Sequence, residues 1–388
     1  MGMFIGRGRK ARRCYGFDEI ALVPGIVPIN PDDVDISFNF HNFNFDIPII
    51  AAAMDGVVDV NFAIHMSKLG GFAVLNLEGI QTRYDDPTEI LNDIIMATPA
   101  QATNILQNMY LTPIKEELIS KRIKEIKDAG AIAVVSSIPQ KAERFGAIAQ
   151  EAGADIFVVQ ATITSARYVS TSKFTHLNFK NFCTNMNIPI IVGNCVTYES
   201  ALELMDCGIS GLMVGVGPGS ACTTRGVLGV GIPQVTATAD CAAARDFHFK
   251  QTSRYIPIIT DGGMSVGGDI CKAFASGADA VMVGSAFAKS KEAPGKGYHW
   301  GMATPHKNLP RGTRIYVGIT STLEEILFGP AHLDDGSQNL LGALKTSMGM
   351  CGAKNIREMQ LTEIIIAPSI KTEGKVFQQA QHIGMGKI

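Results

Sequence analysis

The chain has 388 residues, of which 46% are hydrophobic and only 18% are charged. Because an average soluble domain has about 25% charged residues, this composition excludes disorder as the main state of the chain. Thirty-four Lys and Arg against 36 Asp and Glu give a formal net charge of −2, which excludes a general attraction to nucleic acid or to an anionic membrane.

The N-terminal segment is basic, with Arg7, Arg9, Lys10, Arg12 and Arg13 close together. No apolar segment follows it, so we do not expect a secretory signal. A solvated arm and a nuclear or nucleic-acid address are both open interpretations. No apolar run in the chain approaches the length, about 18 residues, that spans a bilayer, and the eight cysteines show no CxxC spacing. We therefore expect a cytoplasmic protein that binds neither membrane nor nucleic acid.

Eight short runs rich in Ile, Val and Ala follow along the chain. Continuous apolar runs of this length are typical of strands buried on both faces, as in parallel sheets. Segments with apolar residues at helical spacing lie between them, such as Ile119, Ile123 and Ile126. Eight strand and helix units in one chain predict an α/β fold, a (β/α)8 TIM barrel with 1–388 as one catalytic domain. The runs are 48–54, 71–79, 131–137, 155–161, 189–194, 211–217, 257–263 and 280–286.

Two parts of the chain depart from this regular spacing. About 60 residues separate the second run from the third, which leaves room for an extra helix around 87–97 and for no second domain. After the eighth run, residues of about 290–345 include stretches rich in Gly, Pro and Thr, which predict an active-site flap. The last segment, about 368–388, is expected to be a flexible tail.

The seventh and eighth predicted strands end in Asp261-Gly262-Gly263 and in Gly284-Ser285. In TIM barrels the loops after these strands often hold phosphate, and glycine lets backbone N–H groups approach a phosphate closely. Asp261 has the chemistry to accept hydrogen bonds from ribose hydroxyls. The alternative is that the glycines only make tight turns.

The sixth predicted strand leads into the loop 215–225, with the sequence GVGPGSACTTR. Its glycines and proline predict a rigid loop whose carbonyls can coordinate a hard cation, and Ser220 can donate to phosphate. Cys222 is placed as a nucleophile, with Thr224 and Arg225 near enough in sequence to assist proton transfer or to lower the thiol pKa. A cysteine is more often a small hydrophobic residue, and we interpret the other seven in that way.

These motifs in this order resemble the IMP dehydrogenase and GMP reductase family. The resemblance also includes Ala53-Met54-Asp55 and the segments GGFAVLN, VGNCVT and SMGMCGA at 70–76, 192–197 and 347–353, and so covers nearly the whole chain. It implies a (β/α)8 barrel that forms a homotetramer, in which Cys222 attacks C2 of a purine nucleotide. The chain is similar in particular to a short bacterial branch of the family.

The resemblance also implies the ligand-binding residues. The nucleotide phosphate would bind to Ser220, Gly263, Gly284 and Ser285, and the ribose to Asp261. Asn194 would lie beside the base, and the backbone of Met302 would contact the purine. The remaining implied residues are Met54 and Gly262 at the substrate, Gln160 at the NAD cofactor, and Gly217, Gly219 and Cys222, joined by Glu373 and Gly374 of a neighbouring subunit, around a potassium ion.

The sequence departs from the family pattern in ways that bear on the reaction. The gap between the second and third strands is too short for the regulatory CBS modules of full-length IMP dehydrogenases. The flap lacks the adjacent Arg-Tyr pair with which the dehydrogenases activate water. Our candidates for activating water are therefore His306 and Arg311, with Thr224 as a proton relay. It also lacks the Glu of the reductases, and Gln160 replaces the acidic residue that holds the nicotinamide ribose.

From these features we predict an NAD-dependent IMP dehydrogenase, which would oxidise IMP to xanthosine monophosphate through a covalent bond to Cys222. The first alternative is an NADPH-dependent GMP reductase that uses the same thiol. The second is a nucleotide-binding regulatory subunit with little turnover.

Overall fold

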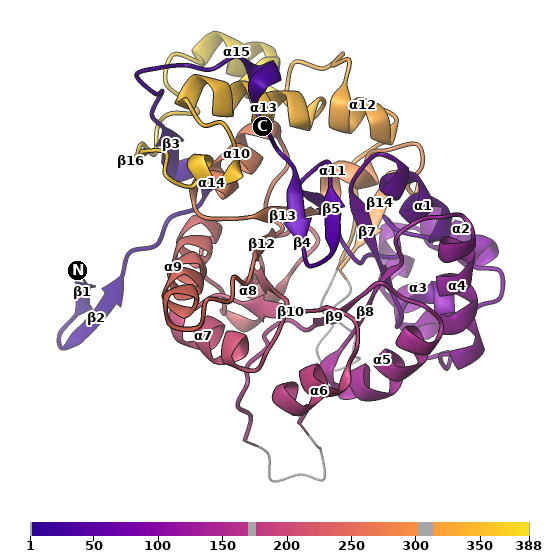
Figure 1. The fold of residues 1–388 in the computed structure, drawn as a ribbon. Coiled ribbons are helices and arrows are strands. Elements are labelled where there is room, and N and C mark those ends of the chain that lie inside the picture. The colour runs from indigo at the N-terminus through magenta and orange to yellow at the C-terminus, as the bar shows by residue number, and fades with distance from the viewer. Residues whose placement is uncertain (1, 170–175, 302–312, 388) are drawn as a thin grey trace.

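The computed structural model describes residues 2–169, 176–301 and 313–387, and its centre is a closed barrel of eight parallel strands (Figure 1). The strand order around the barrel is β6, β7, β8, β9, β10, β11, β12 and β13, with β13 pairing back to β6. This confirms the predicted TIM barrel, and each strand lies inside one of the eight predicted runs or within one residue of it. The bounds are β6 (Ile49–Ala51), β7 (Phe72–Asn76), β8 (Val134–Ser137), β9 (Ile156–Gln160), β10 (Ile190–Cys195), β11 (Gly211–Val214), β12 (Ile258–Asp261) and β13 (Ala280–Val283).

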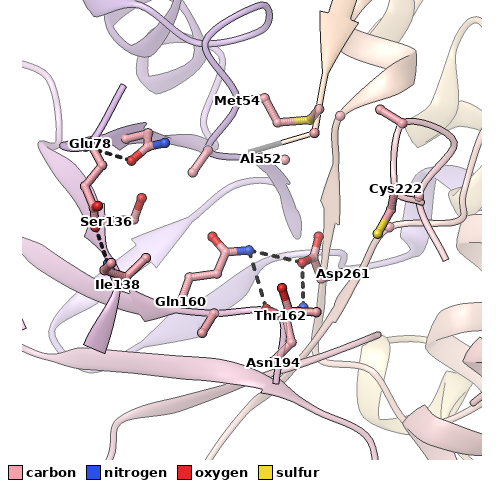
Figure 2. Close-up of a pocket in the computed structure, with 18 of the residues that line it drawn as sticks. Ala52, Met54, Glu78, Ser136, Ile138, Gln160, Thr162, Asn194, Cys222 and Asp261 are labelled. Carbon is pink, nitrogen blue, oxygen red and sulfur yellow. Dashed lines mark hydrogen bonds between the residues drawn. The ribbon is translucent and has the colours of Figure 1, made fainter. Parts of the chain in front are cut away.

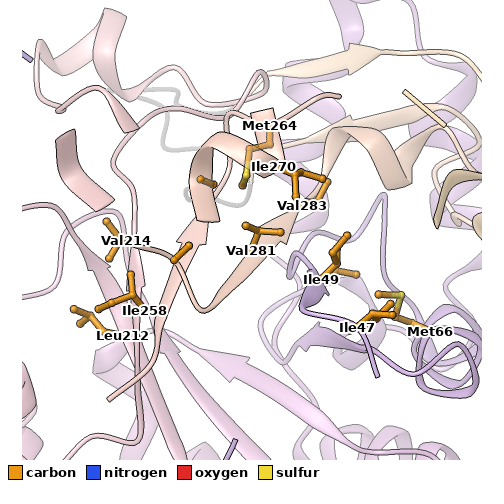
Figure 3. Packing of buried hydrophobic residues seen from close by; sticks show 14 of the residues in the cluster. Ile47, Ile49, Met66, Leu212, Val214, Ile258, Met264, Ile270, Val281 and Val283 are labelled. Atoms are coloured by element: carbon orange, nitrogen blue, oxygen red, sulfur yellow. The ribbon is translucent and has the colours of Figure 1, made fainter. Parts of the chain in front are cut away.

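The barrel strands are mostly apolar because both of their faces are buried, and their polar residues lie toward the carboxyl ends, such as Gln160 of β9 and Asp261 of β12. Ile50 and Met282 belong to one buried cluster, together with the phenylalanines of the hairpin formed by β4 (Phe38–Phe40) and β5 (Phe43–Phe45). Their neighbours Ile49 and Val281 belong to a second cluster, which also contains helix residues such as Ile270 (Figure 3). Successive side chains therefore pack on opposite faces of the strand, as strand geometry requires.

Helices surround the barrel and use the apolar spacing that the sequence shows. In α4, Ile119, Ile123 and Ile126 are all fully buried, as their spacing predicts. Where one extra helix was expected around 87–97, the structure has two, α2 (Thr88–Met96) and α3 (Pro99–Met109). The other helices up to the end of the barrel are α1 (Val60–Lys68), α4 (Glu116–Asp128), α5 (Ala142–Glu151), α6 (Phe179–Asn185), α7 (Tyr198–Asp206), α8 (Thr224–Leu228), α9 (Gln234–Thr252), α10 (Gly267–Ala275) and α11 (Ser285–Ala288).

After the barrel, the chain forms a narrow ribbon and a group of helices. Strands β14 (Tyr298–Trp300) and β15 (Arg314–Tyr316) pair antiparallel. The segment 290–345, expected as a flap, also contains α12 (Leu323–Phe328) and the start of α13 (Leu340–Cys351), which form because Thr322 caps α12 and the leucines of both helices are buried.

Short elements complete the fold at the two ends of the chain. The segment expected as a tail contains α15 (Val376–Gln381), and α14 (Ile356–Met359) precedes it. Strand β16 (Ile364–Ile366) pairs with β3 (Ile20–Leu22). The basic N-terminal arm forms a hairpin of β1 (Gly2–Gly6) and β2 (Arg9–Arg12), which extends away from the body (Figure 1). Among the described residues, no helix combines the length and the apolar character that crossing a bilayer requires.

Candidate active site

A cavity of about 1020 Å³ lies at the carboxyl ends of the barrel strands, where the TIM-barrel fold is expected to place an active site. Cys222 and Asp261 line one side of it, and Glu78 and Ile138 lie on the opposite side (Figure 2). The cavity brings together most of the predicted site residues that the structure describes. These are Met54, Gln160, Asn194, Gly217, Gly219, Ser220, Cys222, Thr224, Asp261, Gly262, Gly263, Gly284 and Ser285.

Arg225 fixes the shape of the loop that carries Cys222. Its Nε donates to the carbonyl of Val216 at 3.0 Å, and its Nη2 donates to the carbonyl of Ile232 at 2.7 Å. Gly217 has a φ of +75°, and a Cβ at this position would lie 2.6 Å from Cγ of Arg225. Glycine is therefore required here both for its backbone conformation and for its lack of a side chain.

The thiol of Cys222 lies beside a single buried hydroxyl. Its Sγ donates to Oγ1 of Thr224 at 3.2 Å, and Thr224 is fully buried at the start of α8. Cys222 itself is partly exposed to the cavity. A nucleophile in contact with a hydroxyl that can pass on a proton is the arrangement that covalent catalysis needs.

Two serine hydroxyls meet where the loops after β11 and β13 approach each other. Ser220 Oγ and Ser285 Oγ are 2.5 Å apart. Gly263 of the loop after β12 has a φ of +81°, and a Cβ there would lie 3.0 Å from Cβ of Pro218, so this third loop packs closely against the first. Hydroxyls and backbone groups from three loops thus converge on one region, which suits a phosphate.

Three polar side chains form a network on the floor of the cavity (Figure 2). Nδ2 of Asn194 donates to Oδ2 of Asp261 at 2.7 Å, and Nε2 of Gln160 lies 3.3 Å from the same oxygen. Burial raises the pKa of Asp261 from 3.8 to about 6, while the hydrogen bond from Asn194 acts in the opposite direction. Gln160, expected at the cofactor, is therefore also a partner of the proposed ribose acceptor.

The side of the cavity opposite Cys222 is lined by residues that the sequence motifs did not identify. The Glu78 carboxylate accepts from the backbone N–H of Ile138 at 2.7 Å and from Nζ of Lys141 at 3.1 Å. Arg83 and Tyr110 also line this side. Glu78 lies near the end of the second predicted run, 71–79, and was identifiable by that position, whereas Arg83 and Tyr110 lie in the segment between the second and third runs, where no motif marks them.

His299 is a further cavity residue that sequence reasoning missed. It lies on β14, is 1% exposed, and has no hydrogen-bond partner for either ring nitrogen among the described residues. Burial lowers its pKa to about 4, so the ring is neutral at physiological pH. Its position two residues before Gly301, in the HWGMA segment, was the one available signal.

Some predicted site residues are not brought to the cavity. Met302, His306 and Arg311 lie outside the described residues. Glu373 and Gly374 are described but do not line the cavity. Their neighbour Lys371 forms ion pairs with Asp269, which lies on the outer helix α10, and with Asp18, which lies beside that helix.

Within one chain, the residues expected to bind the cation therefore lie in two separate places. Gly217, Gly219 and Cys222 lie in one loop of the cavity wall, and the carbonyl of Gly219 accepts from the backbone N–H of Cys222 at 3.0 Å. Within the described part of the chain, no group of three or more His, Cys, Asp and Glu is arranged to hold a metal ion. Backbone carbonyls, which suit a large monovalent ion, are the donors that this loop offers.

Comparison with known proteins gives consistent matches over most of the chain. The model of the IMP dehydrogenase / GMP reductase domain matches residues 14–376. A protein of Mycolicibacterium smegmatis described as an uncharacterized oxidoreductase is 37% identical over 365 residues, which cover 92% of this chain and 97% of the relative. The inosine-5′-monophosphate dehydrogenase of Methanocaldococcus jannaschii is 27% identical, with 96% of each chain covered.

A solved structure agrees with these sequence matches. The crystal structure of an IMP dehydrogenase/GMP reductase-like protein from Corynebacterium glutamicum superimposes with a TM-score of 0.89 at 36% identity, and the match covers 94% of this chain and 97% of that one. In the present chain, the part that matches carries the cavity described above, with the loop of Cys222 and the paired serines. On this evidence the chain belongs to the IMP dehydrogenase / GMP reductase family of oxidoreductases.

Proposed function

We propose that this protein is an IMP dehydrogenase that uses Cys222 as its nucleophile. The observation that carries the proposal is the contact of 3.2 Å between Cys222 Sγ and Thr224 Oγ1 in the same cavity as the Ser220 and Ser285 hydroxyls and Asp261. The thiolate adds to C2 of IMP. The hydrogen on C2 then transfers to NAD⁺ as a hydride, with two electrons. Water then displaces Cys222 from C2, which releases xanthosine monophosphate and regenerates the thiol.

Binding of the nucleotide is divided among the residues of the cavity. The hydroxyls of Ser220 and Ser285, with backbone N–H groups of Gly263 and Gly284, hold the phosphate. Asp261 accepts from the ribose, and Gly262 and Met54 complete the pocket. Asn194, beside the base, donates to Asp261 and so fixes the direction of the carboxylate. By resemblance to the family, the backbone of Met302 would contact the purine.

The second ligand of the reaction is NAD⁺, which accepts the hydride. The cavity continues from Cys222 past Gln160 to Glu78, Tyr110 and Lys141, and its volume of about 1020 Å³ is at the upper end of the roughly 300 to 1,000 Å³ of single-ligand pockets. Pro113, Ile114, Ile138 and Phe145 supply apolar surface on that side. This part of the cavity suits a flat base next to charged groups.

The hydrolytic step needs a group that moves a proton from water. Thr224 relays this proton, with Arg311 or His306 as its partner. Potassium binds to the carbonyls of Gly217, Gly219 and Cys222 and stabilises the loop, and Glu373 and Gly374 of a neighbouring subunit complete the ligand set. The protein that we propose is a cytoplasmic homotetramer, in which this shared ligand set can form.

One sequence feature leaves GMP reductase as the second candidate, although the flap also lacks the Glu of the reductases. The chain between Met302 and Arg314 lacks the adjacent Arg-Tyr pair with which the dehydrogenases activate water. A reductase uses the same thiol and takes hydride from NADPH, and its reaction releases ammonia from C2 without using water.

Absorbance at 340 nm distinguishes the candidates. Purified protein is incubated in potassium buffer with IMP and NAD⁺, and separately with GMP and NADPH. A rise in the first mixture is expected for the dehydrogenase, whereas a fall in the second identifies the reductase. No change in either mixture, combined with measurable IMP binding, would leave a nucleotide-binding subunit and contradict both enzyme assignments.

A further inference from the structure

Arg83 is a buried cation in the wall of the cavity. It follows β7, and its side chain is 9% exposed. Its Nε donates to the carbonyl of Glu78 at 3.0 Å, and its Nη1 donates to the carbonyl of Thr112. Its guanidinium lies 5.7 Å from the ring centre of Tyr110. These contacts fix the side chain in one position.

No carboxylate forms an ion pair with Arg83 within 4.0 Å among the residues that the structure describes. The two nearest acids act on it through space but are occupied by other donors. The Glu78 carboxylate binds Lys141 and the Ile138 N–H. The Asp55 carboxylate accepts from Tyr110 at 2.6 Å and from the Ile80 N–H at 2.9 Å.

Burial without a partner has a cost for this cation. Desolvation lowers the pKa of Arg83, but arginine stays protonated in proteins. A buried charge is normally paired with an opposite charge or neutralised. Nη2 of Arg83 also has no hydrogen bond to the protein in the described part of the chain. An anionic ligand in the cavity would satisfy both the charge and the free donor.

Among the described cations that line the cavity, Arg83 alone lacks a carboxylate partner. Lys141 and Arg144 line the same side of the cavity, but each is ion-paired, with Glu78 and Glu116 respectively. Arg122 has surroundings similar to those of Arg83. It is 7% exposed and also donates to backbone carbonyls, yet it pairs with Glu125 and does not line the cavity.

We propose that Arg83 binds the diphosphate of the dinucleotide that occupies this cavity. The inference rests on the proposed function, because it assumes that a dinucleotide extends from Cys222 toward Glu78. Those two residues face each other across the cavity (Figure 2), and Arg83 is tied to the Glu78 backbone. A diphosphate lies in the middle of a dinucleotide and accepts paired donors from a planar guanidinium.

The experiment compares ADP-ribose, which carries a diphosphate and a second ribose, with adenosine, which carries neither. ADP-ribose and adenosine are titrated calorimetrically into the full-length protein, with Arg83→Met, Arg83→Lys and the control Arg122→Met. We expect Arg83→Met to weaken the binding of ADP-ribose at least tenfold, while the affinity for adenosine stays within about twofold of wild type. Arg83→Lys should recover part of the loss, because it restores the charge but not the planar donors. Arg122→Met should leave the ratio of the two affinities unchanged.

Several outcomes overturn the inference. Equal losses for the two ligands, or the same change in ratio in Arg122→Met, would show that Arg83 only supports the fold. A wild-type protein that binds ADP-ribose no more tightly than adenosine would also exclude a diphosphate site. A melting temperature and an IMP affinity equal to wild type verify that Arg83→Met is folded, and Arg83→Lys provides the measurement if it is not.

The two proposals fail separately. ADP-ribose binding that depends on Arg83, in a protein that turns over neither IMP nor GMP, supports the diphosphate site and rejects the reaction. IMP oxidation with a KM for NAD⁺ that is the same in Arg83→Met and in wild type rejects the diphosphate site and leaves the reaction standing.

Discussion

At the scale of single residues, the carboxylate of Asp261 has a pKa close to the physiological range. Burial raises its pKa from 3.8 to about 6, so below about pH 6 the folded protein holds it protonated. The hydrogen bond from Asn194 at 2.7 Å favours the ionised form. A proton on Asp261 therefore removes charge from the proposed ribose acceptor.

We predict that IMP affinity falls as the pH decreases through about 6, the pKa of Asp261. In Asn194→Ala the carboxylate loses a hydrogen bond that favours its ionised form, so the fall should begin at a higher pH. Isothermal titration between pH 5 and pH 8 measures this shift. The control is Asn181→Ala, an exposed residue of α6. An unchanged profile in Asn194→Ala would reject Asp261 as the titrating group.

Cys222 is expected to act in the chemical step and to contribute little to binding. We predict that Cys222→Ser abolishes turnover and leaves the Kd of IMP within roughly tenfold, because phosphate and ribose contacts are made in ground and transition states alike. Steady-state rates and IMP titration measure the two effects. Cys207→Ser, a cysteine outside the cavity, is the control. A Cys222→Ser variant with near-normal rate would exclude the covalent mechanism.

At the scale of elements, a buried chain of hydrogen bonds joins three parts of the fold around the cavity. Nε1 of Trp300, on β14, donates to the hydroxyl of Tyr110 at 2.8 Å, and that hydroxyl donates to Asp55 at 2.6 Å. Arg314 of β15 donates to the carbonyl of Ala97, just after α2, at 2.7 Å. Both strands of the ribbon are thereby attached to the helical hairpin of α2 and α3.

We predict that Tyr110→Phe lowers the free energy of unfolding by about 1 to 3 kcal/mol, because Nε1 of Trp300 loses its acceptor and the buried Asp55 carboxylate keeps only the hydrogen bond from the Ile80 N–H. The pKa of Asp55 is raised to about 6 by burial, and the Tyr110 hydrogen bond counteracts this rise. The loss should therefore be larger at pH 8, where Asp55 is ionised, than at pH 5. Urea denaturation at both pH values tests this, with the exposed Tyr316→Phe as control. Equal losses at the two pH values would contradict the role of Asp55.

The sequence predicts elements well where each element is determined by its own residues. All eight barrel strands were predictable because a strand buried on both faces is apolar over most of its length. The loop of Cys222 was predictable because Gly217 occupies a conformation that favours glycine. Helix α3 was missed because polar residues interrupt its sequence, PAQATNILQNM, and only Ala102, Leu106 and Met109 are buried.

The rest of the site depends on packing between distant segments. Trp300 and Tyr110 are 190 residues apart in the chain, and no local pattern indicates that they meet. Arg83 and His299 line the cavity for the same reason, since each depends on where a loop or ribbon is placed by other parts of the fold. Such residues become identifiable only when burial and missing partners are known.

At the scale of the whole molecule, the separation of Gly217 and Glu373 suggests that the proposed potassium site is completed by a second chain. We predict that a chain ending at Thr372 needs a higher potassium concentration for half-maximal activity. Co-expression of this chain with full-length Cys222→Ser should restore activity at low potassium, because the inactive chain supplies the missing segment to its neighbour. Initial rates over a potassium titration measure the effect.

The control for this experiment is each variant expressed alone, with melting temperatures to show that both are folded. Mixed oligomers that are no more active than the truncated chain alone would show that the C-terminal segment does not act between subunits. Sedimentation of the wild-type protein as a monomer of 41.5 kDa would contradict the homotetramer itself.

The closure of the barrel between β13 and β6 also determines when the cavity exists during protein synthesis. Ile49 pairs with Val281, and the N–H of Ala52 donates to the carbonyl of Val283 at 3.0 Å. A ribosome that adds roughly 5 to 20 residues per second takes about 10 to 50 s to pass from the first of these strands to the last. Until then, the loops that carry Met54 and Ser285 have no fixed positions relative to each other. A nascent chain therefore has no complete binding site for a nucleotide, and stabilisation by ligand can begin only after the last barrel strand leaves the ribosome.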